Sequence, residues 1–233
     1  MIQLYGISNP GFSFTHTYLL DIINLKKYVN KNKGKTNLTY ADLQAQIDNP
    51  SRVRMIVPFL RKIGIINNAD FDEKNKPIDF NLFFTSEAKP FLKFLDVYSD
   101  DEMNYNNEEL MLRVNKVLQE ILSLYLNNLL KEKEYKIITK YLIRLKSLDK
   151  YEFFFITSYE FNNVDNIMGY TNAIDLIEYY RNNKSIKSSF EFSSNVNCYS
   201  YIMQMLCNFN ICKKIDDHFE IKNEELVKNL IGE

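Results

Sequence analysis

Histidine and cysteine are scarce in this sequence, and their scarcity excludes several kinds of site. Among 233 residues, two are histidines, His16 and His218, and three are cysteines, Cys198, Cys207 and Cys212. Two histidines are too few to build a convincing Ser/His/Asp or Cys/His centre, and the cysteine spacing matches neither a CxxC pair nor a zinc site. An odd, clustered set of thiols fits a reducing compartment, in which they serve as small core residues.

The sequence also lacks long apolar runs, a phosphate-binding glycine loop and a net charge of one sign. No run approaches the roughly 18–20 residues of a membrane span, and the start lacks the pattern of a signal peptide. We therefore expect a cytoplasmic protein without a membrane partner. The composition, 45% apolar and 14% aromatic, is that of a folded chain with room for one large domain or two small ones.

Charge is unevenly distributed, although the formal net charge is only −1. Residues 1–76 contain 11 Lys and Arg against 6 Asp and Glu, a balance of +5. Residues 96–120 contain 2 basic against 7 acidic residues, a balance of −5. A basic first third followed by an acidic connector favours the first third as the face offered to a polyanion.

The stretch from Leu38 to Leu95 has the pattern of a winged helix-turn-helix. It predicts a short helix over Thr39–Ile47, a turn at 48–50 with Asn49 as N-cap and Pro50 at the first helical position, and a second helix over Ser51–Lys62. In the second helix, Val53, Ile56, Val57, Leu60 and Ile63 share one apolar face. Ser51, Arg52, Arg54 and Arg61 occupy the rest of its surface, as a helix that reads the major groove requires.

A two-stranded wing and a closing helix are predicted next. Gly64 ends the second helix, Ile65-Ile66 begins a strand, and residues 67–77 form a polar tip that contains Lys74 and Lys76. Residues 78–85 return as the second strand, and Ser86 is predicted to cap a helix that buries Phe91, Leu92 and Leu95. Pro58 lies inside the second helix and predicts a kink. The alternative is a small α+β core whose helix surface happens to be basic.

The segment before this stretch offers further contacts for DNA. Residues 1–14 show no helical or strand periodicity and predict a turn-bearing arm, whose Asn9, Gly11 and Ser13 could meet the DNA backbone. Residues 17–30 predict a helix with mainly inward Leu19, Leu20, Ile23, Leu25 and Tyr28. The loop that follows carries Lys33 and Lys35, which are candidate phosphate contacts. Surface coil and a solvated turn are the alternatives for the arm and the loop.

The middle of the chain predicts a linker and two helices. Residues 96–107 are acidic and polar, residues 108–130 carry a wide apolar stripe at helical spacing, and residues 134–145 continue as a second helix. The two helices are expected to form a scaffold between the ends of the molecule. Leucine at such spacing is more often core than a dimer seam.

The final third resembles the first third in its order of elements, which predicts a tandem arrangement. The helix at 172–184 parallels that at 17–31, the helix at 197–209 parallels the reading helix, and a short wing turning at 216–217 precedes a helix at 224–231 that Asn223 caps. The second reading helix and the residues before it carry polar candidates for DNA contact, namely Asn195, Asn197, Tyr199, Ser200 and Gln204.

No catalytic residue or metal ligand is predicted in this chain. Asp79, Glu87 and Lys89 match the PD…(D/E)xK spacing of a Mg²⁺-dependent nuclease, but that site needs its acids on adjacent strands. Glu87 and Lys89 are instead predicted in the first turn of a helix, where an acid is expected at the dipole's positive end. A match at Glu132–Lys136 also lies on a helix. The chain is therefore expected to bind rather than to catalyse.

The order of these motifs resembles the start of FokI-like type IIS restriction endonucleases. Tyr5-Gly6 followed by Asn9-Pro10-Gly11 is similar to the aromatic-Gly…Asn-Pro-Gly arm of that family, and Ile63–Ile66 and Thr85–Phe91 are similar to its "lGfi" and "T-x-x-(G/A)-x-x-(F/L)" segments. Leu148–Phe154 also resembles the "L-(S/T)-K-x-E-F" stretch of AlwI-like relatives.

In that family, winged-helix subdomains recognise an asymmetric site and a separate nuclease domain cuts at a distance. The resemblance implies that Asn9, Gly11, the basic loop, Arg52 and Arg54 face the DNA. The sequence lacks the nuclease half, so it could be a recognition fragment, a separate specificity subunit or a relative that does not cut. A cofactor, Mg²⁺, would be needed only with an attached nuclease domain or subunit.

The sequence thus predicts a mainly α-helical protein with small β wings. It has a winged-helix domain over 1–98, a linker and helical scaffold over 99–148, and a second winged-helix-like domain over 149–233. The expected partner is double-stranded DNA, which it would recognise sequence-specifically for a restriction endonuclease. A stand-alone regulator, a plasmid or phage replication initiator, and a protein-interaction scaffold are the alternatives.

Overall fold

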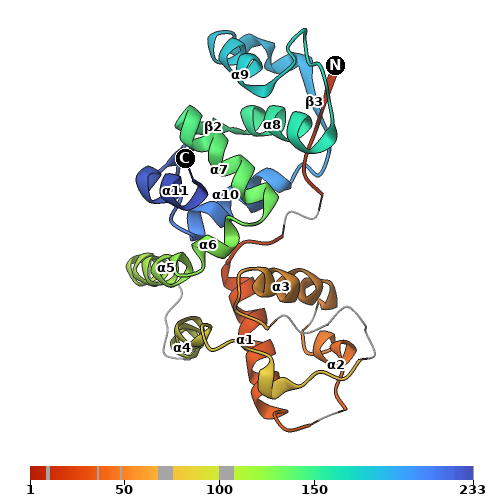
Figure 1. Ribbon diagram of the computed structural model, residues 1–233, viewed down its shortest axis with the longest axis vertical. Coiled ribbons are helices and arrows are strands. Elements are labelled where there is room, and N and C mark those ends of the chain that lie inside the picture. Colours follow the sequence, from red (N-terminus) through yellow and green to blue (C-terminus); the bar gives the residue numbers. More distant parts are fainter. Residues whose placement is uncertain (9–10, 36, 48, 68–75, 100–107, 233) are drawn as a thin grey trace. The chain divides into compact units, whose positions relative to one another are not determined.

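The protein is mainly helical with small sheets, as expected (Figure 1). The computed structural model describes residues 1–8, 11–35, 37–47, 49–67, 76–99 and 108–232. The chain divides into two compact units, Gly11–Glu132 and a second unit that combines Met1–Pro10 with Lys133–Glu233. This division differs from the three ranges expected, because the first ten residues group with the C-terminal part. Within the described ranges, no helix is both long and apolar enough to span a bilayer.

In the described part of the first unit, the regular elements are helices and a 3₁₀ turn. In chain order they are α1 (His16–Lys31), α2 (Tyr40–Gln44), α3 (Pro50–Lys62), the 3₁₀ turn η1 (Phe80–Leu82), α4 (Lys89–Tyr98), α5 (Glu108–Ser123) and α6 (Leu126–Leu129).

Helices α1 and α3 are confirmed, and the capping chemistry explains where α3 begins. The Asn49 side chain accepts a hydrogen bond from the Ser51 amide, and Pro50 occupies the first turn. Leu20, which was predicted to point inward in α1, is exposed. Ile22 and Val29, which were not predicted to do so, are buried. Every member of the predicted apolar face of α3 is buried: Val53, Ile56, Val57, Leu60 and Ile63.

Helix α2 is shorter than predicted and begins with a capping box. The Thr39 hydroxyl accepts from the Asp42 amide, and the Asp42 carboxylate accepts from the Thr39 amide at 2.8 Å. This reciprocal pair satisfies two amides that the helix leaves without a partner. The helix ends at Gln44, three residues before the predicted Ile47, which is buried.

The predicted strand over 78–85 is wrong except at its end, where Phe83–Thr85 pairs with Ile65–Asn67. The Asp79 side chain accepts hydrogen bonds from the Asn81 amide and side chain, both at 2.9 Å, and this local turn starts η1 in place of a ladder. Among the described residues of the wing, antiparallel pairing is limited to the bridges Thr39↔Pro77 and Ile66↔Phe84. Most of the predicted tip, including Lys74, lies outside the described residues.

The predicted cap of α4 is also wrong. Ser86 precedes the helix, which has Ala88 at its N-cap and starts at Lys89. Pro90 lies in the first turn, where its missing N–H leaves no hydrogen bond unmade, so the turn can begin without a side-chain cap. The helix buries Phe91, Phe94, Leu95 and Tyr98.

The single long helix predicted over 108–130 is broken after Ser123 into α5 and α6. At the break, the Tyr125 hydroxyl donates to the carbonyl of Glu87 at 2.7 Å, and Asn128 donates to the carbonyl of Ile63 at 3.1 Å. We infer that these two hydrogen bonds stabilise the break more than a continuous helix would be stabilised by its own backbone bonds. The expected apolar stripe is only partly core, because its member Val117 is 47% exposed.

The second unit surrounds two small sheets. Its elements are β1 (Ile2–Tyr5), α7 (Lys133–Leu145), β2 (Ser147–Asp149), α8 (Lys150–Asn162), α9 (Ala173–Asn182), the 3₁₀ helix η2 (Lys184–Ser189), β3 (Phe190–Ser194), α10 (Cys198–Asn208), β4 (Cys212–Ile215), β5 (His218–Ile221) and α11 (Glu224–Ile231). Strands β2, β5 and β4 form one antiparallel sheet in that order, and β1 pairs in parallel with β3 (Figure 1).

The predicted N-terminal arm is a strand over Ile2–Tyr5, which corrects the expectation of an irregular segment. Its partner β3 lies far away in the sequence, with Ile2 opposite Phe190. The pairing continues to Gly6, whose amide donates to the Ser194 carbonyl at 3.2 Å. A Cβ at Gly6 would lie 2.6 Å from the Cys198 sulfur, so glycine is required for this approach.

The helices α7, α9, α10 and α11 and the β4–β5 hairpin are confirmed. Asp216 adopts a φ of 49° in the hairpin turn, a conformation that aspartate tolerates. Asn223 is at the N-cap of α11, but its side chain does not cap the helix and instead donates to the Asn210 carbonyl at 2.7 Å. Strand β2 was not predicted. Helix α8 was not predicted either. Its run Phe153–Ile156 is fully buried, so the sequence there lacks the alternation of apolar and polar residues that identifies a helix.

Candidate nucleic-acid interface

The exposed face of α3 is short and polar. Ser51 and Arg54 are exposed, whereas Val53, Ile56 and Val57 are buried in the core of the first unit. The Ser51 hydroxyl is held by the Asn49 side chain, which also caps the helix. Arg54 is therefore the guanidinium that this face offers most openly to a ligand.

Arg52 is held inside its own unit. Its guanidinium lies 2.9 Å from a carboxylate oxygen of Asp21 in α1, and the Asp21 side chain is 12% exposed. The same guanidinium is 5.8 Å from the centre of the Tyr18 ring. A base contact by Arg52 would have to share or break the pair with Asp21, so the predicted role in base reading is less accessible to it than to Arg54.

The candidate DNA contacts of the arm and the loop differ in their exposure to solvent. Ser13 is only 6% exposed and Gly11 is half-buried with a φ of 82°, so neither is presented as an open backbone contact; Asn9 lies outside the described residues. Lys33 and Lys35 are exposed after α1, and the Lys35 ammonium donates to the Asn32 side chain at 2.8 Å. Lys76 is exposed as well.

Helix α10 presents a second polar face, in the second unit. Asn197, Ser200 and Gln204 are exposed on it, and Asn195 is exposed just before it with a φ of 51°. Tyr199 differs, because it is half-buried and its ring packs 5.4 Å from that of Phe153 and 5.6 Å from that of Phe219. Burial raises the pKa of the Tyr199 hydroxyl. Tyr199 is thus part of the local core more than of the exposed face.

The ends of α3 and α10 are built by the same hydrogen bonds. After α3, the Ile65 amide donates to the Leu60 carbonyl at 2.8 Å, and the Gly64 amide donates to the Arg61 carbonyl at 3.0 Å. After α10, the Ile211 amide donates to the Leu206 carbonyl at 2.9 Å, and the Asn210 amide donates to the Cys207 carbonyl at 3.0 Å. Both are Schellman turns, with Gly64 and Asn210 at φ values of 84° and 60°.

A later segment of each unit forms equivalent hydrogen bonds to its turn. The Thr85 hydroxyl donates to the Gly64 carbonyl at 2.6 Å, and the Asn223 amide group donates to the Asn210 carbonyl at 2.7 Å. The Thr85 amide bonds to Ile65 at 3.1 Å, as the Lys222 amide bonds to Ile211 at 2.8 Å. We call this arrangement the repeated junction.

Helices α2 and α8, which come before α3 and α10 in their units, also begin in the same way. Leu38-Thr39 enters α2 through the Thr39/Asp42 capping box, and Leu148-Asp149 enters α8 through a capping box of Asp149 and Glu152. Because β2 and α8 directly follow α7, the counterpart of α1 in the second unit is α7. The sequence pattern pairs α1 with α9, which instead lies between α8 and α10.

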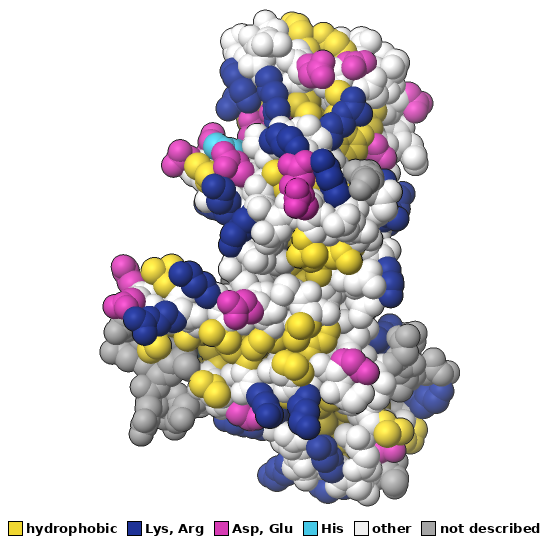
Figure 2. All heavy atoms as spheres, turned by 60° about the vertical axis from the view of Figure 1, so that its left-hand side comes forward, with side chains coloured by type: hydrophobic (Ala, Val, Ile, Leu, Met, Phe, Trp, Pro, Cys, Tyr) yellow, Lys and Arg dark blue, Asp and Glu magenta, His cyan; other side chains and the backbone are white. Residues whose placement is uncertain are grey.

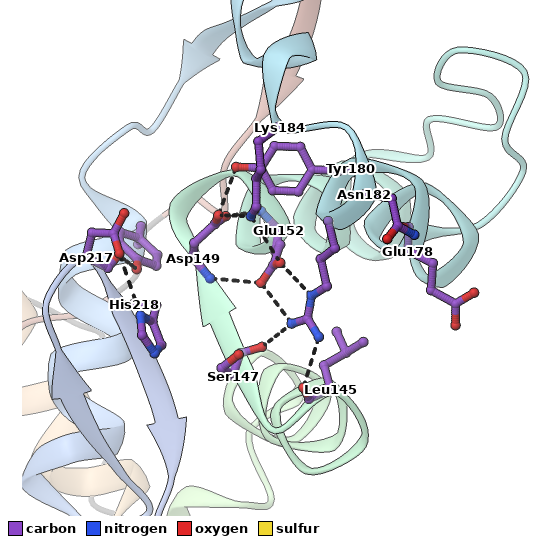
Figure 3. Close-up of polar contacts among 12 residues, drawn as sticks. Leu145, Ser147, Asp149, Glu152, Glu178, Tyr180, Asn182, Lys184, Asp217 and His218 are labelled. Carbon is purple, nitrogen blue, oxygen red and sulfur yellow. Dashed lines mark hydrogen bonds and ion pairs between the residues drawn. The ribbon is translucent and has the colours of Figure 1, made fainter.

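A polar cluster fixes this intervening segment to the rest of the second unit (Figure 3). The Arg181 guanidinium donates to both carboxylate oxygens of Glu152, at 2.8 and 3.2 Å, and to the carbonyls of Leu145 and Ser147, at 3.2 and 2.8 Å. Glu152 is only 3% exposed. Arg181 thereby joins α9 to α7, β2 and α8.

Asp149 is the second anchor of the cluster. Its carboxylate accepts from the Tyr180 hydroxyl at 2.8 Å and from the Lys184 ammonium at 3.0 Å (Figure 3). Burial alone would raise the pKa of Asp149, but the donors on Glu152, Lys184 and Tyr180 outweigh it and hold that pKa below its usual value. Burial and the bond to Asp149 raise the pKa of Tyr180. The cluster is internally satisfied, so it positions elements and offers no free acid or base.

Sequence reasoning missed this cluster. The Asp-x-x-Glu spacing of 149 and 152 is a capping-box signal that could have located the start of α8. No local signal connects Glu152 with Arg181, because that contact depends on the tertiary placement of α9.

The other sites weighed from the sequence are not assembled. Asp79 starts η1 and Glu87 lies in the turn before α4, so the nuclease-like spacing belongs to two local turns. Over the described ranges, no group of three or more His, Cys, Asp or Glu side chains could hold a metal ion. The Cys207 and Cys212 sulfurs lie 3.2 Å apart as buried free thiols, and burial raises the pKa of Cys198 to about 11.

Comparison with known proteins adds no assignment. No family model, curated protein or solved structure matches this chain.

Proposed function

We propose that this chain recognises double-stranded DNA sequence-specifically through two winged-helix units, with α3 and α10 as the reading helices. Its role would be the recognition module of a type IIS-like restriction endonuclease, acting with a nuclease domain or subunit. The observation that carries the proposal is the repeated junction, which gives both helices the same exit into a returning chain.

The order of elements supports this reading in each unit. In the first unit the order is α1, a segment that Thr39 bridges to Pro77, α2, α3 and a returning segment that is bridged at Phe84. In the second unit it is α7, β2, α8, α10 and the β4–β5 hairpin, with α9, η2 and β3 inserted between α8 and α10. In the second unit the sheet order β2-β5-β4 places the first strand beside the last. A winged helix has this arrangement, in which the second of the paired helices enters the major groove.

The two faces suit different kinds of contact. Arg54 can donate two parallel hydrogen bonds to a guanine edge, and Ser51 can bond to a phosphate or a base. Asn197 and Gln204 carry amides, the groups that pair with adenine. Lys33, Lys35 and Lys76 supply charge for neighbouring phosphates. Two differently built faces on one chain favour an asymmetric target over a palindrome.

Selection of bound sequences from a random duplex pool, followed by a salt titration on the enriched duplex, tests the proposal. We expect an asymmetric enriched site and an affinity that falls steeply with salt. A palindromic site bound by a dimer would favour a stand-alone regulator or replication initiator, because a two-fold protein reads two-fold DNA. Absence of enrichment and of binding at low salt would refute the DNA-binding proposal.

A protein-interaction scaffold is the second candidate, and the exposure of α5 favours it. Leu112, Val117 and Leu124 are 63%, 47% and 66% exposed on or just after that helix. Apolar side chains left in contact with water on one helix are a feature of protein-binding surfaces. This candidate predicts negligible affinity for any duplex at moderate salt.

A further inference from the structure

A hollow of about 440 Å³ lies beside α1 in the first unit, between that helix, η1 and α4. Among the described residues that line it, four are lysines, Lys26 and Lys33 from the α1 side and Lys89 and Lys93 from α4, and one is acidic, Asp96. Four positive charges against one negative leave a balance of +3 in a single concave surface.

The charges in the hollow fall into two groups. Lys26 is buried, donates to the Leu92 carbonyl at 2.6 Å and pairs with Asp96, whose side chain is 70% exposed, so the charge of Asp96 is balanced by Lys26. Lys33, Lys89 and Lys93 are exposed, and none of them forms an ion pair with another described residue. Three ammonium groups therefore face the hollow without a counter-charge from the described part of the chain.

Positive charge continues along the same helix. A second hollow, of about 410 Å³, is lined by Lys27, Lys31 and Lys35, and the described residues that line it include no acid. Figure 2 shows Lys and Arg side chains close together near the bottom of the view, in the part of the chain formed by residues 11–132. The carbonyl end of α1 would itself repel an anion, so any anion bound here depends on the lysines.

We propose that the hollow between α1 and α4 binds backbone phosphates of the DNA, beside the base pairs that α3 contacts. This inference rests on the proposed function and adds Lys89 and Lys93 to the surface that meets DNA. Lysine acts on a phosphate as a point charge and lacks the planar fork with which arginine reads a base. The contacts would therefore add affinity and salt dependence without sequence preference.

The test is the salt dependence of duplex binding by the double variant Lys89→Gln/Lys93→Gln. The slope of log K against log salt is negative, and removal of one lysine–phosphate interaction reduces its magnitude by about 0.9. We therefore expect a reduction of about 1.8 in magnitude for two. The enriched sequence should stay the same. The control Lys116→Gln/Lys136→Gln removes the same charge from exposed positions on α5 and α7 and should leave the slope unchanged. Thermal unfolding of both variants checks that they are folded.

Two results would overturn the inference while leaving the proposed function intact. One is an unchanged slope in the hollow variant, and the other is an equal decrease in the control variant, which would indicate a general charge effect. Titration with inorganic pyrophosphate separates the two sources of phosphate. Lysine-dependent binding of pyrophosphate combined with an unchanged duplex slope would make the hollow a small-anion site and overturn the backbone assignment. Failure of the proposed function is distinct, because the unmodified chain would then bind no duplex.

Discussion

The carboxylate of Asp21 lies 2.9 Å from the guanidinium of Arg52 and joins α1 to the first turn of α3. The pair divides two arginines that look alike in sequence. Arg52 pairs with Asp21 and so holds α3 against α1. Arg54, two residues later, is exposed. Arg52 is thus engaged with α1, whereas Arg54, on another side of the same helix, is the arginine that we propose for DNA recognition.

Replacement of the two arginines should separate these roles. Arg54→Ala should weaken binding to the selected duplex by about 1–3 kcal/mol and relax preference at one base pair, with little change in stability. Arg52→Ala should lower the free energy of unfolding by about 1–3 kcal/mol, because it leaves the nearly buried Asp21 carboxylate unpaired. Urea unfolding and duplex titration of each variant measure both quantities. A stability loss for Arg54→Ala equal to that for Arg52→Ala would contradict the division.

The Arg181–Glu152 pair should matter far more than a surface ion pair. Arg181→Ala removes two hydrogen bonds to the buried Glu152 carboxylate and two to backbone carbonyls. We expect a loss of about 3 kcal/mol, the lower end for broken buried pairs, because the Arg181 side chain is 33% exposed. Lys228→Ala, which breaks an exposed pair with Glu224 in α11, is the control and should cost less than about 1 kcal/mol. Similar losses in urea unfolding for the two variants would show that the cluster does not anchor α9.

Acid should weaken the second unit partly through Asp149. Its folded-state pKa is lowered, so its contribution to stability is complete above the unfolded value of about 3.9 and is lost as the pH falls through the lower folded-state pKa. The free energy of unfolding should therefore decrease as the pH falls below about 4. Asp149→Asn should show a shallower decrease over that range. An identical pH dependence in the variant and the unmodified chain would disprove the role of this carboxylate.

The repeated junction can be tested at Gly64. A Cβ there would lie 2.8 Å from the Asn128 side-chain nitrogen, and the residue has a φ of 84°. Gly34 has the same φ, but a Cβ there would have no atom within 4 Å. Gly34→Ala thus measures the backbone strain alone, of about 1–3 kcal/mol, and Gly64→Ala should cost more than that. Equal shifts in the thermal midpoint would mean that Asn128 moves aside freely.

Local chemistry made several elements predictable from sequence. Asn49 and Pro50 located the start of α3, and the spacing of its apolar residues gave the face that is buried. The turn at Asp216 and the helix at 224–231 followed from turn and periodicity signals in the same way. These features depend on residues a few positions apart, which is the range over which sequence patterns carry information.

Features that depend on distant partners could not be predicted. Ile2–Tyr5 becomes a strand only because β3 lies beside it, and the break before α6 depends on contacts from Tyr125 and Asn128 to residues more than thirty positions away. For the candidate site, the exposure of Arg54 followed from helical periodicity. The pairing of Arg52 with Asp21 and the lysines brought together from α1 and α4 required the tertiary structure.

The central claim is that α3 and α10 each read part of one DNA site. Selection from a random duplex pool, repeated with Arg54→Ala and with Gln204→Ala, tests it most directly. We predict that each variant loses preference at its own base pair, several positions apart, while the rest of the enriched asymmetric sequence is retained. If the unmodified chain enriches no sequence, or if both variants enrich the unmodified sequence unchanged, the two helices do not read DNA and the account is wrong.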